Sequence, residues 1–192
     1  MAFLSTKFPS FDKTIFISLL VDVDQHTLEE VKTKLIEGNK DYDFAFFNTN
    51  YIISKEHLLN GIHRAMINYK NGSAKSKTLN TEIILNMSPV SNIMEALKRF
   101  GIDSSKESAN LLCVKVIDDD ESLEDINNTL ITNLGVSKDQ NVELTDDFLL
   151  KSVDVAKFKK LYKLNDAKYN DKKPLQNQLT RLAIGACLLR GT

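Results

Sequence analysis

Two kinds of hydrophobic pattern alternate along this chain, and each predicts a different element. Short apolar runs rich in Ile, Phe, Leu and Val are typical of buried strands. We assign strands to residues 13–21, 44–47, 81–86 and 111–117. The third run is followed by Pro89, which cannot donate a ladder hydrogen bond and should end the strand. Residues 141–144 can form one more short strand.

Helices are predicted where apolar residues recur at helical spacing behind a residue that can cap the first turn. The expected capping residues are Thr27, Ser54 and Asn92, and a further helix is expected to begin at Asp154. Two further helices should follow the acidic turn at 118–121 and the polar loop at 165–174, the second of them running over 175–189. Leu35 and Tyr69 fall on the apolar faces of the first two helices, so we expect both side chains to be buried.

The order of these elements favours an α+β fold. Strands and helices alternate irregularly, and several connections are too short for a parallel crossover. We therefore expect a mixed α/β chain with a largely antiparallel mixed sheet flanked by helices. A chain of 192 residues has the length of one domain, so we assign residues 1–192 to a single domain that can bury its core without disulfides.

Composition narrows the classes of function. Hydrophobic residues at 42% and charged residues at 27% are typical of a globular protein, and the net charge of −1 excludes a general polycation. Any contact with nucleic acid must therefore come from a local patch. The early apolar run at 15–21 lacks a cleavage pattern, and no run is long enough to span a bilayer, so we expect no signal peptide and no membrane contact.

No set of side chains predicts catalysis, metal binding or a cofactor. Of three histidines, His57 and His63 share a predicted helix at a spacing unsuited to one metal ion, and the seven glycines form no phosphate-binding loop. Cys113 and Cys187 lie in apolar surroundings, as reduced core thiols of a nuclear or cytosolic protein do. We therefore expect no cofactor and no enzymatic activity. A small hydrolase would need a nucleophile and base that the sequence does not offer.

A basic segment follows the second predicted helix. Between residues 57 and 81 the chain has no acidic residue. The cationic residues of this segment are Arg64, Lys70, Lys75 and Lys77. Neighbouring Ser, Thr and Asn side chains can bond phosphate or base edges. Composition alone leaves two interpretations open, a solvated loop and an RNA-binding patch.

The last predicted helix changes character along its length. Its first half is amphipathic, whereas residues 182–189 are apolar on every side. Such a helix is either inserted deeply in the core or packed with one face on its domain and the other on a partner. Gly185 would allow another helix to approach closely. The pattern by itself supports both interpretations.

Several segments resemble, in the same order, the PRPK-binding-protein family, the small accessory subunit of the KEOPS or EKC complex. The most specific segment reads Thr81-Glu82-Ile83-Ile84-Leu85-Asn86-Met87-Ser88-Pro89 and continues to Phe100-Gly101-Ile102. Weaker similarity lies at residues 75–80, 112–115 and 160–164, and Leu188-Leu189-Arg190-Gly191 is similar to the fungal carboxyl terminus. Residues 118–150 and 165–174 match little.

The resemblance implies a compact α/β subunit that does no chemistry itself. It implies direct binding to the PRPK-like kinase/ATPase, with modulation of its activity, and contact with the threonylcarbamoyl transferase subunit only through that kinase. The complex adds threonylcarbamoyl to the adenosine beside the anticodon of tRNA. The fungal complex is also linked to telomere maintenance and transcription. We therefore expect this chain in the nucleus and the cytoplasm, and at telomeric chromatin. A free-standing RNA-binding module, or less readily a small hydrolase, is the alternative.

The resemblance also indicates which residues to test. Archaeal members hold the single-stranded 3′ CCA end of tRNA, which favours the RNA interpretation of the basic segment. The candidate RNA-binding residues are Arg64, Lys70, Lys75, Lys77, Asn80, Ser88 and Asn92. Tyr69 or Phe100 can offer a stacking surface, although we favour core packing for both. The candidate kinase-binding residues are Leu182, Ile184, Leu188, Leu189 and Arg190, the last pairing with the kinase or with the carbonyls of its own helix.

Overall fold

The computed structural model describes residues 2–118 and 120–190. The chain divides into two compact units. Unit 1 comprises Met1–Asn48 and Gly101–Leu144, and unit 2 comprises Thr49–Phe100 and Thr145–Thr192. The assignment of residues 1–192 to a single domain stays a prediction.

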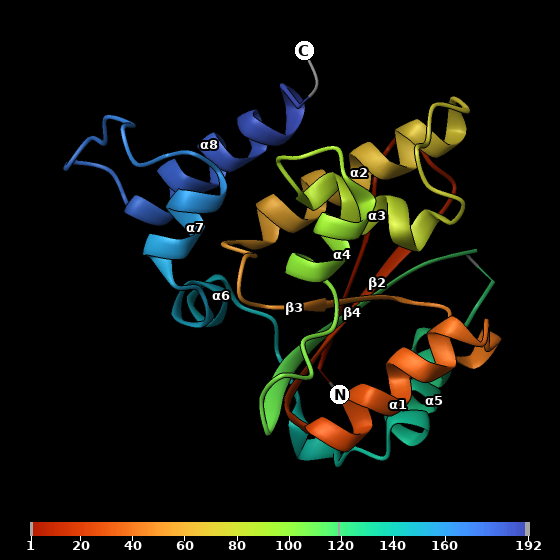
Figure 1. Cartoon of the computed structure of the whole chain (residues 1–192). Helices are drawn as coiled ribbons and strands as arrows, with labels where there is room; N and C mark the ends of the chain where they lie inside the picture. Colours follow the sequence, from red (N-terminus) through yellow and green to blue (C-terminus); the bar gives the residue numbers. More distant parts are fainter. Residues whose placement is uncertain (1, 119, 191–192) are drawn as a thin grey trace. The chain divides into compact units, whose positions relative to one another are not determined.

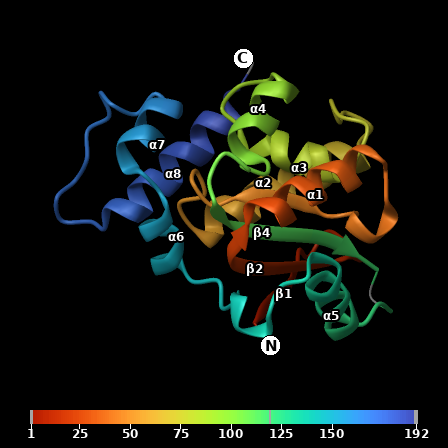
Figure 2. The ribbon, with the colours of Figure 1, turned by 60° about the horizontal axis from the view of Figure 1, so that its bottom comes forward.

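Unit 1 is built on an antiparallel sheet, in which β1, β2 and β4 run side by side (Figure 2). The strand order is β1 (Phe3–Lys7), β2 (Thr14–Asp24), β4 (Ser108–Ile117) and β3 (Ala45–Asn48), and β5 (Asn141–Val142) also pairs with β2. The sheet confirms the predicted α+β class and the strands expected at 13–21, 44–47, 111–117 and 141–144. The short strand β1, which the pattern does not reveal, pairs with β2 from Phe3 opposite Ser18 to Lys7 opposite Thr14.

Two helices pack on one face of this sheet, α1 (Gln25–Ile36) and α5 (Leu123–Leu134). The core they share contains Phe16, Leu20, Leu28, Phe46, Cys113 and Leu130. The cap of α1 is Asp24, whose carboxylate accepts from Thr27 N at 2.9 Å, and not the predicted Thr27. The helix therefore begins one turn earlier than expected. Leu35 is 38% exposed, so its predicted burial is wrong.

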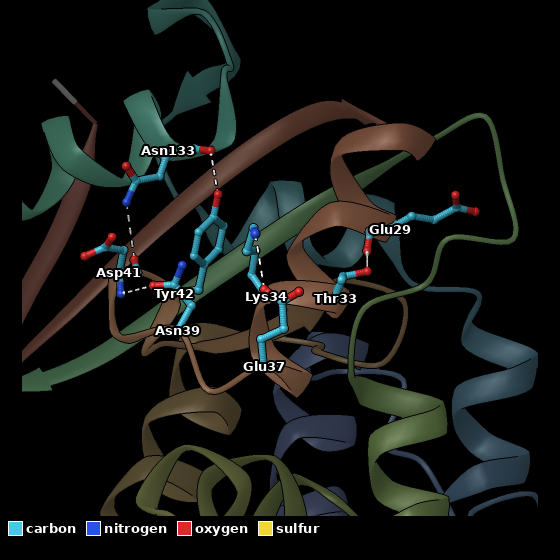
Figure 3. Close-up of polar contacts among 8 residues, drawn as sticks. All are labelled: Glu29, Thr33, Lys34, Glu37, Asn39, Asp41, Tyr42 and Asn133. Carbon is cyan, nitrogen blue, oxygen red and sulfur yellow. Dashed lines mark hydrogen bonds and ion pairs between the residues drawn. The ribbon is translucent and has the colours of Figure 1, made fainter.

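The turn after α1 is fixed by polar contacts to α5 (Figure 3). It contains the 3-10 helix η1 (Lys40–Tyr42). The Tyr42 hydroxyl donates to Asn133 O at 2.9 Å, and Asn133 Nδ2 donates to Asp41 O at 3.4 Å. Asn39 Oδ1 accepts from Asp41 N at 2.9 Å and caps the turn. A second 3-10 turn, η2 (Lys138–Gln140), follows α5. Its Gln140 side chain donates to Val21 O and Asp22 O, where β2 shifts register.

The described part of unit 2 is helical. Its helices are α2 (Lys55–Lys70), α3 (Leu79–Met87), α4 (Ile93–Phe100), α6 (Asp146–Ser152), α7 (Val155–Leu161) and α8 (Leu175–Leu188). The predicted caps Ser54 and Asn92 are confirmed, since each side chain accepts from a backbone amide of the following turn. The helix expected from Asp154 is confirmed as α7, and the Asp154 carboxylate caps it. In Figure 1, α3 lies beside α2, which also contacts α8. Helices α2 and α3 approach closely at Gly61. A Cβ there would lie only 2.3 Å from Met87 Sδ, so a larger residue would require a shift.

The strand predicted at 81–86 is wrong, because these residues form α3. Thr78 Oγ1 accepts from Thr81 N at 3.2 Å and caps the helix. The β-branched Ile83 and Ile84 favour a strand locally, but both are buried as parts of a helix packed on α2. The missed signal was the polar pair Glu82 and Asn86, whose spacing of four places both on one helical face.

Candidate functional site

The cationic loop, residues 71–78, joins α2 to α3 in unit 2. Lys75 and Lys77 on this loop are exposed, and so is Lys70 at the end of α2. Asn80 lies in the first turn of α3 and is half-buried. The structure thus keeps four of the seven candidate RNA-binding residues on the loop or at the helix ends that bound it.

A buried carboxylate, Glu82, holds the inner side of the cationic loop. Glu82 Oε2 accepts from Lys75 N, Ser76 N and Ser76 Oγ, each at 3.0 Å. Its other oxygen accepts from Asn68 Nδ2 at 2.9 Å and from Asn86 Nδ2 at 3.0 Å. All five partners are donors, which suits an ionised carboxylate, because only the ionised form accepts at both oxygens without donating.

The protonation of Glu82 follows from these partners. Burial alone would raise the pKa of Glu82, but the hydrogen bonds from Asn68, Ser76 and Asn86 outweigh burial and hold the pKa below its usual value. The carboxylate is therefore charged at neutral pH. Glu82 is not among the predicted site residues, because residues 81–86 were predicted to form a strand.

The two stacking candidates differ in exposure. Phe100 is fully buried, with its ring centroid 5.8 Å from that of Tyr51, so its predicted core role is confirmed. Tyr69 is 44% exposed, and the core role predicted for it is wrong. Its hydroxyl donates to Lys77 O at 3.0 Å, so this ring lies against the cationic loop. Tyr69 can therefore offer a ring face to a base beside the lysines.

The other three candidate RNA-binding residues have structural partners elsewhere in unit 2. Arg64 donates to Cys187 O at 2.9 Å and to Leu188 O at 3.4 Å, at the C-terminus of α8. Ser88 is fully buried, and its hydroxyl accepts from Val90 N at 3.2 Å. Asn92 is exposed and caps α4 through Glu95 N at 2.9 Å. Of these three, the Ser88 hydroxyl is the one hidden from solvent.

The second candidate surface is the α8 end, defined as Leu188, Leu189 and Arg190. Leu188 is 49% exposed and Leu189 is 69% exposed. The opposite face of α8 is buried through Leu179, Ala183 and Cys187. Leu182 and Ile184, the remaining candidates, are half-buried between the two faces. A Cβ added at Gly185 would meet no described atom within 4 Å, so this side of the helix is open.

Arg190 does not cap its own helix. Its guanidinium donates to Leu85 O, to Ser88 O at 3.1 Å and to Asn86 Oδ1 at 3.2 Å, all at the C-terminal end of α3. These contacts favour the arginine because the last carbonyls of a helix lack intrahelical donors. The predicted pairing with the carbonyls of its own helix is therefore wrong. Its predicted contact with the kinase stays a prediction.

A buried polar cluster lies between α2, α3 and α7. His57 Nε2 is 3.2 Å from the Tyr162 hydroxyl, which donates to Met87 O at 2.7 Å. Because the hydroxyl proton points to Met87, His57 donates to the Tyr162 oxygen from Nε2. Nδ1 of the same ring is buried with no described hydrogen-bond partner. Burial lowers the pKa of His57 to about 3.

The two cysteines are free and buried. Burial raises the pKa of the Cys113 thiol far above its usual value and raises the pKa of Cys187 to about 12. Neither is a thiolate at neutral pH, and the thiolate is the nucleophilic form. Among the described residues, no group of three or more His, Cys, Asp or Glu side chains could hold a metal ion. The described helices are also too short or too polar to cross a membrane.

The chain is similar to known proteins over most of its length. The family described as "Kinase binding protein CGI-121" matches residues 21–191. A Debaryomyces hansenii protein named "EKC/KEOPS complex subunit CGI121" is 49% identical over 184 residues, which cover 93% of this chain and 92% of that protein. Proteins of the same name are 42% identical over 198 residues in Candida albicans and 34% identical over 185 residues in Yarrowia lipolytica. Each match covers 96% of this chain and at least 97% of the relative.

Proposed function

Because the chain belongs to the CGI-121 family of kinase-binding proteins, we propose that it is the small accessory subunit of an EKC/KEOPS complex. We propose further that it binds the kinase subunit through the α8 end. One observation carries this placement: Leu188 and Leu189 are exposed at the end of a helix whose opposite face is buried. Adjacent exposed leucines beside an open helix side are typical of a protein interface.

The cationic loop is our candidate for tRNA contact. Exposed Lys75 and Lys77 can neutralise phosphates, and Tyr69 lies against the same loop. A positive surface beside an aromatic ring is what single-stranded RNA requires. We therefore propose that this loop helps to hold the 3′ end of tRNA. Asn80 follows this loop by two residues, in the first turn of α3.

The subunit is proposed to act on its partner without chemistry of its own. Contact with the transferase subunit would run through the kinase. Its proposed locations are the cytoplasm and the nucleus, and in the nucleus telomeric chromatin, in line with the family resemblance. The alternative is a free-standing RNA-binding module, which the exposed lysines also support.

Affinity purification of the tagged chain from its own cells, with mass spectrometry, tests the proposed function. The kinase subunit should be recovered in near-equal amounts, and the transferase subunit should be lost when the kinase is depleted. Recovery of the transferase without the kinase would contradict the proposed order of contacts. An RNA-binding module would bind tRNA when purified alone and would recover neither subunit.

Reversing two charges on the cationic loop should weaken tRNA binding. Lys75→Glu with Lys77→Glu removes two exposed cations, so the slope of log affinity against log salt should fall by about one to two. Filter binding with tRNA over a range of salt concentrations measures this slope. Lys172→Glu with Lys173→Glu makes the same charge change at exposed positions elsewhere in unit 2 and is the matched control. Equal slopes for both variants would show that the cationic loop is only solvated.

A further inference from the structure

A continuous chain of hydrogen bonds joins the α8 end to the cationic loop within unit 2. Arg190 Nη2 donates to Asn86 Oδ1 at 3.2 Å, and Asn86 Nδ2 donates to Glu82 Oε1 at 3.0 Å. Glu82 Oε2 then accepts from the loop amides of Lys75 and Ser76, both at 3.0 Å. We call Arg190, Asn86 and Glu82 the polar relay.

The chemistry of the polar relay admits one orientation of its central amide. The oxygen of Asn86 faces a guanidinium, which only donates, and its nitrogen faces a carboxylate, which only accepts. Turning the amide over would place two donors together at one end and two acceptors at the other. Asn86 and Glu82 are 2% and 0% exposed, so water cannot replace a lost partner without rearrangement of the helix.

The relay also explains two buried polar residues that packing does not require. Asn86 Nδ2 bonds Glu82 O at 2.8 Å as well, so the Asn86 side chain is fixed by three contacts. The described groups that donate hydrogen bonds to Glu82 are neutral, and the Arg190 guanidinium interacts with its charge without a direct hydrogen bond. The loop amides are therefore part of what stabilises this buried charge, and in turn the charge fixes the loop.

We propose that Glu82 and Asn86 are positioning residues that hold the cationic loop in its RNA-binding conformation and couple it to Arg190 at the α8 end. The identity of the two ligands, tRNA and the kinase, rests on the proposed function. A partner that buries Leu188 and Leu189 restricts the motion of the neighbouring Arg190. Through the hydrogen bonds of Asn86 and Glu82, this restriction also reduces the motion of the loop. Binding at either surface therefore strengthens binding at the other, because coupling between sites is reciprocal.

Glu82→Gln tests the hold on the loop with almost no change in size. The new amide nitrogen must face donors at one of the two oxygen positions, so it loses bonds on that side. Amide hydrogen exchange at Lys75 and Ser76 should become roughly ten- to a hundred-fold faster, and tRNA affinity should fall about ten-fold. Glu95→Gln, on a carboxylate paired with Arg99 on α4, is the matched control and should change neither measurement.

A double-mutant cycle tests the coupling. Arg190→Ala and Asn86→Ala should each speed amide exchange at Lys75 and Ser76, and the double variant should add little to Asn86→Ala alone. Arg64→Ala is the matched control, because Arg64 also bonds carbonyls at the end of α8 but is not part of the polar relay. Additive effects, or equal effects of Arg64→Ala and Arg190→Ala, would overturn the coupling.

The outcomes separate this inference from the proposed function. Unchanged exchange at Lys75 and Ser76 in Glu82→Gln overturns the hold on the loop, whatever the RNA result. The proposed hold on the loop is also overturned if Glu82→Gln binds tRNA normally while Lys75→Glu with Lys77→Glu does not. That outcome leaves the proposed function standing. If the charge reversal has no effect, the RNA role fails while exchange still tests the relay. Ser76→Ala removes one donor from the loop side and replaces Glu82→Gln if that variant unfolds.

Discussion

Replacing Leu188 and Leu189 by Asp should abolish binding of the kinase subunit and leave the chain folded. The two side chains are 49% and 69% exposed, so the isolated chain loses little packing. In a desolvated interface each leucine contributes roughly 1.5–3 kcal/mol, which corresponds to at least about ten-fold in affinity per residue. A buried carboxylate adds its own desolvation cost. Co-purification with the kinase measures the effect.

The controls for this experiment separate an interface from a core position. Leu175→Asp places one carboxylate at the other end of α8, on a leucine that is 41% exposed, and should retain kinase binding. The thermal midpoint of the double variant should stay close to that of the natural chain. A collapsed midpoint would assign the leucines to the core. Normal binding at a normal midpoint would place the kinase interface elsewhere on the chain.

Mild acid should destabilise the chain through His57. Burial lowers the pKa of this imidazole from its ordinary value of 6.5 to about 3. Below pH 6.5, His57 is therefore protonated in the unfolded chain but not in the folded chain. The free energy of unfolding falls as the pH drops through this range. The loss should approach about 1.4 kcal/mol for each pH unit until the folded pKa is reached. Urea unfolding followed by circular dichroism between pH 7 and 5 measures it.

The His57 effect can be isolated from that of the carboxylates. Between pH 6.5 and 5 most carboxylates stay ionised in both the folded and unfolded chain, so they contribute little to the slope. His57→Gln, which can still donate to the Tyr162 hydroxyl, and His57→Phe, which keeps a ring against Phe158, should both flatten the pH dependence. A slope that persists in both variants would assign the acid sensitivity to other groups.

The family was recognisable from the sequence because its signals are contiguous. The sequence motif at 81–102 is the same whether the segment forms a strand or a helix. The family resemblance therefore did not depend on the secondary-structure assignment, which was wrong for residues 81–86. Matches over nearly the whole chain to fungal proteins of one name confirm it. The individual contacts with RNA and kinase stay predictions.

The sequence by itself determined the elements whose signals are local. Ser54 and Asn92 cap helices as predicted, because a cap bonds an amide only two or three residues ahead. The strands at 13–21 and 111–117 were evident from their continuous apolar runs, which suit burial on both faces. The α+β class followed from the order of these elements.

Only the tertiary structure decided the elements and contacts that depend on distant residues. Ile83 and Ile84 form a helix because α3 packs on α2, against their local preference for a strand. Arg64 and Arg190 bond carbonyls that lie more than one hundred residues away along the chain. Glu82 lies at one end of the basic segment, but neither its charge nor its spacing from other residues predicts that it is buried beneath the loop. Hydrogen bonds between distant residues are set by folding, which is why the polar relay appears only in the structure.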